Sequence, residues 1–219
     1  MKLKNKIDFR ETLPTEIVSE RIILRKPILK DVNDLVKNGN EKELSYLTYY
    51  LPYPLNKKEA EKLILENQTN KELIRFAIFL KKNKEVIGLL DLHNWKRGET
   101  TPVLHSHQPQ VSSPRLHTSK QFSATFLQNA SAGGKVKIGY WIGKEYRRKG
   151  YVSEIVPKVI EYAFNELKVE KIIAKVLIDN IASQKLLEKF NFVKTKIVPG
   201  DKFLDGKRVD TISYELNRK

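Results

Sequence analysis

The strongest candidate for chemistry is the basic stretch Arg147-Arg148-Lys149-Gly150-Tyr151-Val152-Ser153, which lies between an expected strand and an expected helix. A helix N-terminus leaves several amide N–H groups unpaired and aligned with the helix dipole, so it attracts anions. Three cations precede the turn, and Gly150 lets a ligand approach the backbone closely. The stretch predicts a pyrophosphate site, with an ordinary basic surface turn as the alternative. Its spacing fits neither a nucleotide-hydrolysing phosphate loop nor a dinucleotide fold, so nucleotide hydrolysis and hydride transfer are poorly supported.

Regular elements on both sides of this stretch would position it. Residues 136–142 have the composition of a strand, and one apolar face continues along a helix from Gly150 onward. Pro157 lies inside that helix and is expected to kink it or to make its first turns irregular. Further along, the pattern predicts a buried strand at 171–178, a helix at 180–190 and a final strand at 211–216, and it leaves open one more strand around 192–197.

The N-terminal half predicts two helices between strands. Asn56, followed by Glu59 three residues later, forms a capping box that starts the second helix. The expected elements, in chain order, are a strand at 21–25, a helix at 29–38, a helix from Asn56 toward Asn67, and a hairpin of strands at 75–80 and 85–92. With the elements that follow, the order is β-α-α-β-β-β-α-β-α-β.

Residues 98–134 differ in composition from the rest of the chain. Their 37 positions contain three charged residues, whereas the other 182 contain 64. Such a segment has little to bury, so we expect a flexible insertion in a hairpin loop of one domain that covers residues 18–217. Three of the four histidines lie in the segment without nearby carboxylates or thiols, so we expect no dedicated metal site.

Composition limits the classes of function. The chain has 219 residues, 40% of them apolar, which suffices for one well-buried core. The absence of cysteine excludes disulfides and a thiol nucleophile. The chain begins without the apolar stretch of a signal peptide, so we expect a cytoplasmic protein that does not associate with membranes. The net charge of +15 favours polyanionic surroundings, such as ribosomes or cofactor phosphates. The alternative is that the charge only keeps the surface well solvated. No interleaving of aromatic and basic residues predicts specific nucleic-acid binding.

Two motifs resemble those of the GNAT superfamily of N-acetyltransferases. Arg147-x-x-Gly150-x-Val152 resembles the superfamily's Gln/Arg-x-x-Gly-x-Gly/Ala loop. The strings Ile138-Gly139-Tyr140-Trp141-Ile142-Gly143 and Gly150-Tyr151-Val152-Ser153-Glu154 resemble the branch that acetylates ribosomal-protein N-termini (RimJ/RimL-like), and so does the segment 180–192. The resemblance covers residues 18–217 without 98–134, and the two motifs occur at the right separation and in the right element order.

The resemblance implies an α/β (α+β) fold with a mixed, mostly antiparallel central sheet, about four flanking helices and two splayed central strands that bind acetyl-CoA. Loop amides would hold the pyrophosphate, and the free edge of the strand that ends at Gly143 would pair with the pantetheine arm. The side chains of Tyr140 and Trp141 are expected mainly to pack in the core. The expected cofactor-binding residues are Trp141, Ile142, Gly143, Arg147, Arg148, Lys149, Gly150, Tyr151, Val152, Ser153 and Asn180.

The resemblance also implies a catalytic residue. Ser183 would lie near the cofactor sulfur and protonate the leaving thiolate, while Asn180 would orient the cofactor or a water. Helix capping is the alternative for both. The chain departs from the family at Val152, where a β-branched residue replaces Gly or Ala near the phosphates, and at Asn191, which replaces Gly. Asn tolerates the left-handed conformation of a helix end better than most residues.

The acceptor and the general base are less defined. Lys137 and Lys202 stand where related enzymes have acidic residues, which leaves Asp91, His93 and Asp201 as candidate bases. The pKa of an α-amine is about 8, against about 10.4 for a lysine amine, so an α-amine needs only a weak base. This favours the N-terminal α-amine of a protein, such as a ribosomal protein, as acceptor. Tyrosines of one loop are expected near the acceptor, namely Tyr46, Tyr49, Tyr50 and Tyr53.

Two other functions remain open. One is a small-molecule amine or polyamine acetyltransferase. The other is a non-catalytic basic binding protein on a degenerate acetyltransferase scaffold, for which Val152 and the missing acidic residues would be signs of lost catalysis. An absence of acetyl-CoA binding would identify the degenerate scaffold. An acceptor screen would distinguish the protein N-terminal acetyltransferase from the small-molecule acetyltransferase.

Overall fold

One mixed sheet organises the chain. The computed structural model describes residues 16–48, 51–70, 72–96, 134–204 and 206–219. Within them, eight strands lie in the order β1-β2-β3-β4-β5-β6-β8-β7. Every neighbouring pair is antiparallel except β5 and β6, which are parallel, so the predicted mixed, mostly antiparallel sheet is confirmed. The strands are β1 Glu16–Val18, β2 Ile22–Arg25, β3 Leu73–Leu80, β4 Glu85–Lys96, β5 Gly134–Ile142, β6 Val169–Leu177, β7 Val193–Leu204 and β8 Lys207–Asn217.

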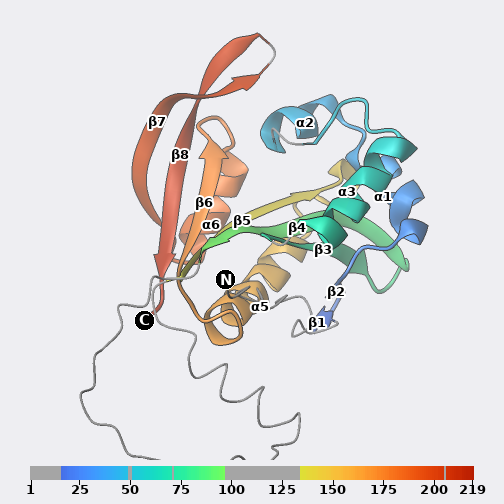
Figure 1. Ribbon diagram of the computed structural model, residues 1–219, viewed down its shortest axis with the longest axis horizontal. Coiled ribbons are helices and arrows are strands. Elements are labelled where there is room, and N and C mark those ends of the chain that lie inside the picture. The colour runs from blue at the N-terminus through green and yellow to red at the C-terminus, as the bar shows by residue number, and fades with distance from the viewer. Residues whose placement is uncertain (1–15, 49–50, 71, 97–133, 205) are drawn as a thin grey trace, which may run out of the picture.

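Helices cover both faces of the sheet (Figure 1). Helices α1, α2 and α3 enclose one apolar cluster, which contains Leu35, Leu89 and Trp141. Helices α5 and α6 pack on the opposite face against a second cluster, which contains Ile155 and Tyr214. The helices are α1 Val32–Gly39, α2 Lys42–Thr48, α3 Lys57–Thr69, α5 Tyr151–Asn165 and α6 Ile181–Lys189, with 3-10 turns η2 Leu29–Asp31 and η3 Lys144–Tyr146. No α-helix in these described ranges is long and apolar enough to cross a membrane.

Local sequence signals place most of these elements. The Asn56 side chain accepts a hydrogen bond from the Glu59 amide at 3.0 Å and so caps α3 as predicted. Asn191 has a φ of 62°, which confirms the left-handed conformation expected after α6. Helix α5 remains helical through Pro157, so the proline does not end the helix. The Ser153 carbonyl lacks its intrahelical donor there, because proline has no N–H.

Three elements differ from the sequence predictions. Helix α2 was not predicted, because it has only seven residues and buries only Leu44 and Thr48, which is too short a pattern to show a period. Strand β1 was missed for the same reason, since it has three residues. Strand β7 extends to Leu204, beyond the strand considered around 192–197, because its pairing with β8 resumes after an irregularity between Val198 and Lys202.

The connection between β4 and β5 is where the sequence predicts an insertion. Strand β4 ends at Lys96 and β5 begins at Gly134, and the two strands are antiparallel neighbours. Apart from Gly134, the segment 98–134 lies outside the described residues, and so do the three histidines within it.

Candidate active site

The two parallel strands at the centre of the sheet separate along part of their length. Strands β5 and β6 pair from Gly134 opposite Val169 to Lys137 opposite Ile173, and no pair follows between their remaining residues. A cleft of about 1010 Å³ opens at this separation, lined by residues 138–142 of β5 and 174–176 of β6. The predicted splay is thus present. The unpaired backbone groups of β5 offer an edge to which an extended ligand can bind.

The N-terminus of α5 closes one end of the cleft. Gly150 has a φ of 80°, and its carbonyl accepts the first helical hydrogen bond from the Glu154 amide at 3.0 Å. The amides of Tyr151, Val152 and Ser153 precede that bond and have no partner among the described residues. All three residues line the cleft. Unpaired amides at the positive end of a 15-residue helix fit the predicted pyrophosphate site.

Arg21, which the sequence did not single out, immediately precedes β2 and contacts this turn. Its guanidinium donates to the Lys149 carbonyl at 3.1 Å and to the Glu154 carboxylate at 2.6 Å. It also lies 4.7 Å from the centroid of the Tyr151 ring. These contacts fix the turn on both sides of Gly150. A β-carbon at Gly150 would have only an Arg21 nitrogen within 4 Å, at 3.4 Å, so the turn is open toward a ligand.

Arg147, which the sequence predicts to bind the cofactor, is held by two carboxylates. Its guanidinium donates to Glu41 at 2.9 Å and to Glu43 at 3.1 Å, and its Nε donates to the Ile142 carbonyl at 3.3 Å. The charge is therefore paired, and the side chain ties the phosphate turn to α2. Arg148 and Lys149 are exposed beside it and remain the cations that can attract an anion.

Trp141, Ile142 and Gly143, which were predicted to bind the cofactor, are packed against the rest of the protein at the end of β5 and just after it. Trp141 is 2% exposed, and its ring belongs to the apolar cluster under α1–α3. Ile142 is buried in the cluster on the opposite face. The Gly143 amide donates to the Ile87 carbonyl at 2.9 Å, and a β-carbon there would lie 2.9 Å from that of Asn38. Gly143 is thus required for close packing against α1, and its amide is not available to a cofactor.

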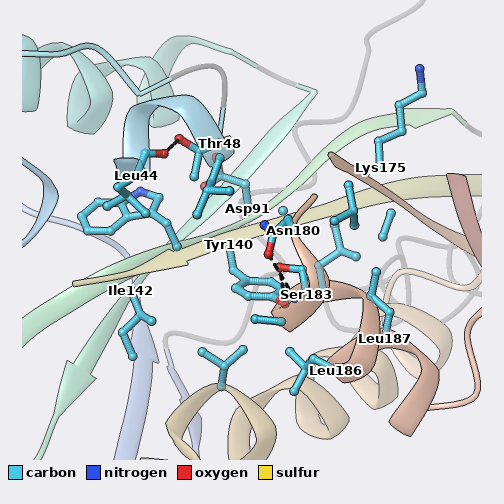
Figure 2. Close-up of a pocket in the computed structure, with 18 of the residues that line it drawn as sticks. Leu44, Thr48, Asp91, Tyr140, Ile142, Lys175, Asn180, Ser183, Leu186 and Leu187 are labelled. Carbon is cyan, nitrogen blue, oxygen red and sulfur yellow. Dashed lines mark hydrogen bonds between the residues drawn. The ribbon is translucent and has the colours of Figure 1, made fainter. Parts of the chain in front are cut away.

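The predicted catalytic serine has a partner that the sequence assigned to the core. The Tyr140 hydroxyl donates to Ser183 Oγ at 3.2 Å, and both residues line the cleft where β5 and β6 separate (Figure 2). Burial raises the pKa of Tyr140 to about 12, so the phenol stays protonated at neutral pH. Asn180 caps α6, because its side chain accepts from the Ser183 amide at 3.2 Å. The capping and functional interpretations of Asn180 and Ser183 are therefore compatible.

The carboxylates of the candidate bases Asp91 and Asp201 are each paired with a basic side chain. Both Asp91 oxygens accept from the Arg75 guanidinium, at 2.9 and 2.7 Å, and both side chains are 4–5% exposed. Asp201 accepts from Lys175 and from Thr211. Burial alone would raise the pKa of Asp201, but these hydrogen bonds lower it below its ordinary value, which makes it a weak base. His93, half-buried and opposite Lys137 in the β4–β5 register, also lines the cleft.

Helix α2 forms the nearby wall of the cleft. The α2 side chains that line the cleft are Glu43, Leu44, Leu47 and Thr48. The Tyr46 hydroxyl donates to Asp179 at 3.2 Å and so joins α2 to the loop after β6. Tyr53 is 53% exposed and does not line the cleft, and Tyr49 and Tyr50 lie outside the described residues. Val152, the departure from the family loop, packs partly against the apolar cluster under α5.

Comparisons with known proteins agree with this geometry. Residues 21–193 match the family model of the acetyltransferase (GNAT) domain. The uncharacterized N-acetyltransferase p20 of Bacillus licheniformis is 26% identical over 210 residues, which cover 93% of this chain and 96% of p20. Among solved structures, the microcin C7 self-immunity acetyltransferase MccE, in complex with acetyl-CoA and AMP, has a TM-score of 0.68 at 18% identity over 94% of this chain and 98% of its own. RimL, a ribosomal α-N-protein acetyltransferase in complex with coenzyme A, has a TM-score of 0.66 at 16% identity over 92% and 96%. At these identities the two structures establish the fold, and the family match over most of the chain establishes that it belongs to the GNAT family of acetyl-CoA-dependent N-acetyltransferases.

Proposed function

We propose that this N-acetyltransferase modifies the N-terminal α-amines of proteins, ribosomal proteins among them. The observation that carries the proposal is the pairing of the two candidate carboxylates, Asp91 with Arg75 and Asp201 with Lys175. Neither is available as a strong base or as a counter-ion for a cationic amine. At neutral pH an α-amine is uncharged roughly several hundredfold more often than a lysine or polyamine amine. A weak base such as His93 or a water therefore suffices for an α-amine.

The residues around the cleft have roles consistent with acetyl transfer. Bound acetyl-CoA supplies its acetyl group as a thioester, and the acceptor nitrogen displaces sulfur while one proton leaves the amine and another reaches the thiolate. The amides of residues 151–153 hold the pyrophosphate, and the free edge of β5 holds the pantetheine arm. Because the Tyr140 hydroxyl donates to Ser183, the Ser183 hydroxyl is directed to donate its own proton onward, to the leaving sulfur. Tyr140 is thus a positioning residue for Ser183.

Substitutions in this hydroxyl pair test the assignment. We expect Ser183→Ala to lower kcat about 100-fold, as for loss of a general acid, and Tyr140→Phe to lower it about tenfold. Each change should leave the Kd for acetyl-CoA within about twofold, because the pyrophosphate and pantetheine contacts remain. The double variant should be no slower than Ser183→Ala alone, because the two hydroxyls act as a unit. Steady-state kinetics and calorimetry measure these quantities.

Tyr162→Phe is the matched control for this pair. Tyr162 is a buried tyrosine of α5 that packs edge-on against Phe76 and does not line the cleft. Its substitution should leave kcat unchanged. A Ser183→Ala variant with wild-type kcat would remove Ser183 from the mechanism, and additive losses in the double variant would contradict the positioning role of Tyr140.

An acceptor screen tests the α-amine itself. Peptides with a free N-terminus and one internal lysine are compared with the same peptides blocked by N-terminal acetylation, and with a polyamine. We expect acetylation of the free peptides only, at the α-nitrogen, as located by mass spectrometry. Acetylation of the polyamine or of lysine in preference to the α-amine would overturn the proposal.

The net charge of +15 would draw the enzyme to ribosomes, and this attraction should weaken as salt is added.

A further inference from the structure

Basic side chains gather at one part of the cleft, on the face of the sheet covered by α1–α3. The residues are His93 of β4, Lys137 of β5, Lys175 of β6 and Lys202 of β7, and all four line the cleft. Lys137 and Trp141 are four residues apart on one strand, so both side chains point to the same face. Trp141 packs in the cluster under α1–α3, which identifies that face. Four strands thus bring basic side chains together at one place in the cleft.

The positive charge in this basic cluster exceeds the negative charge around it. Asp201 accepts from Lys175 Nζ at 3.0 Å with each of its oxygens, and it opposes the charge of three lysines. Burial, and then the neighbouring charges of Lys175 and Lys202, lower the pKa of Lys137. Within the described residues the half-buried Lys137 ammonium has no ion-pair partner. A partly desolvated cation among like charges is unfavourable, and a bound anion would relieve it.

The other acidic residues that line the cleft have partners outside this cluster. Glu43 pairs with Arg147, Glu66 and Asp91 pair with Arg75, and Asp179 accepts from Tyr46. Glu72 is exposed beside the start of β3. Among the charges that act on the pKa of Lys137, three lysines, Lys175, Lys202 and Lys135, therefore stand against the single carboxylate of Asp201.

The side chain of Trp141, a residue that lines the same cleft, carries a buried and unpaired donor. The Nε1 of Trp141 is the buried side-chain polar atom left without a hydrogen-bond partner in the part of the chain that the structure describes. A buried donor without an acceptor is unusual in a folded protein, and an oxygen of a bound ligand would satisfy it.

We propose that the acceptor carries a carboxylate close to its reacting amine and that Lys137 and Lys202 bind this carboxylate. The proposal rests on the proposed function, so the acceptor is a protein N-terminus with Asp or Glu among its first residues. The distance supports this class. Tyr140, beside Ser183, marks the site of transfer, and Lys137 lies three residues away along β5, or roughly 10 Å. In an extended peptide, that distance from the α-amine reaches the side chains of residues two to four.

Matched peptides and lysine variants test the proposal. One series has Asp or Glu at positions two to four, and the other has Asn or Gln at the same positions. We expect kcat/KM to be about tenfold higher for the acidic series at low salt, and the ratio of the two series to shrink toward one at about 0.5 M salt, since the Debye length becomes short. Lys137→Met and Lys202→Met should each reduce the ratio. A ratio is measured because it is insensitive to a general loss of activity or of folded protein.

Lys135→Met is the matched control. Lys135 lies on the same strand two residues from Lys137, is exposed and does not line the cleft, so its loss removes the same charge without touching the acceptor. For the Lys135→Met variant, the ratio of kcat/KM between the acidic and the amide peptides should equal that of the wild type. Equal kcat/KM for the two peptide series, or a preference that both lysine variants retain, would overturn the proposal and leave α-amine acetylation standing. Free glutamate and aspartate form a further arm: their acetylation without that of any peptide would refute the peptide acceptor while retaining the carboxylate site.

Discussion

Replacing Gly150 with Glu is expected to weaken acetyl-CoA binding by about 100-fold or more. The substitution places a carboxylate at the turn whose following amides, those of residues 151–153, face the cleft. The negative charge would repel the pyrophosphate and compete for the amides that bind it. It would also place a side chain where the backbone has a φ of 80° and where the turn is open toward the ligand. Calorimetric titration with acetyl-CoA measures the loss.

Gly150→Ala separates charge from backbone strain. A β-carbon at this position meets only an Arg21 nitrogen, at 3.4 Å, so alanine fits sterically and is disfavoured by its positive φ alone. We expect Gly150→Ala to lower stability by about 1 kcal/mol and to change the Kd for acetyl-CoA by only a few-fold. Circular dichroism shows whether both variants are folded. A folded Gly150→Glu protein that binds acetyl-CoA as the wild type does would exclude this turn as the pyrophosphate site.

The sequence alone predicts the parts of this site that depend on local chemistry. The glycine turn before a helix, the Asn56 cap and the left-handed Asn191 each follow from the preferences of a few adjacent residues. The element order predicts most of the sheet, and the resemblance to GNAT enzymes supplies the splay of β5 and β6. These features are accessible because each is encoded within one short segment or one recognisable motif.

The contacts that the sequence could not reveal join distant segments. Within its own segment Arg147 has the pattern of a phosphate ligand, yet its partners Glu41 and Glu43 lie more than 100 residues earlier. Tyr140 alternates along β5 like a core residue, and its bond to Ser183 exists only because α6 packs beside the splayed strands. The basic cluster needs four strands to bring its members together. Pairing across a sheet decides these roles, and no local pattern encodes it.

The buried ion pair between Arg75 and Asp91 is the second place where a single substitution should have a large effect. Both side chains are 4–5% exposed, on β3 and β4, and the guanidinium also donates to the Leu63 carbonyl of α3 at 2.8 Å. Arg75→Met would leave the Asp91 carboxylate buried without its counter-charge. We expect a loss of about 3–5 kcal/mol in the free energy of unfolding, because a buried charge without a partner is strongly destabilising. Urea denaturation followed by circular dichroism measures it.

Two further variants decide whether the loss comes from the uncompensated charge. Arg75→Met combined with Asp91→Leu removes both charges, and it should recover much of the stability that Arg75→Met loses, because replacing a buried pair by apolar groups is often neutral. Lys62→Met breaks the exposed pair of Lys62 with Glu59 and should cost no more than about 1 kcal/mol. If the double variant were as unstable as Arg75→Met, the cause would be lost packing and lost hydrogen bonds to α3. If instead the double variant recovers stability while losing acetyl transfer, the polar pair is required in the wall of the cleft, where Asp91 and Arg75 both lie.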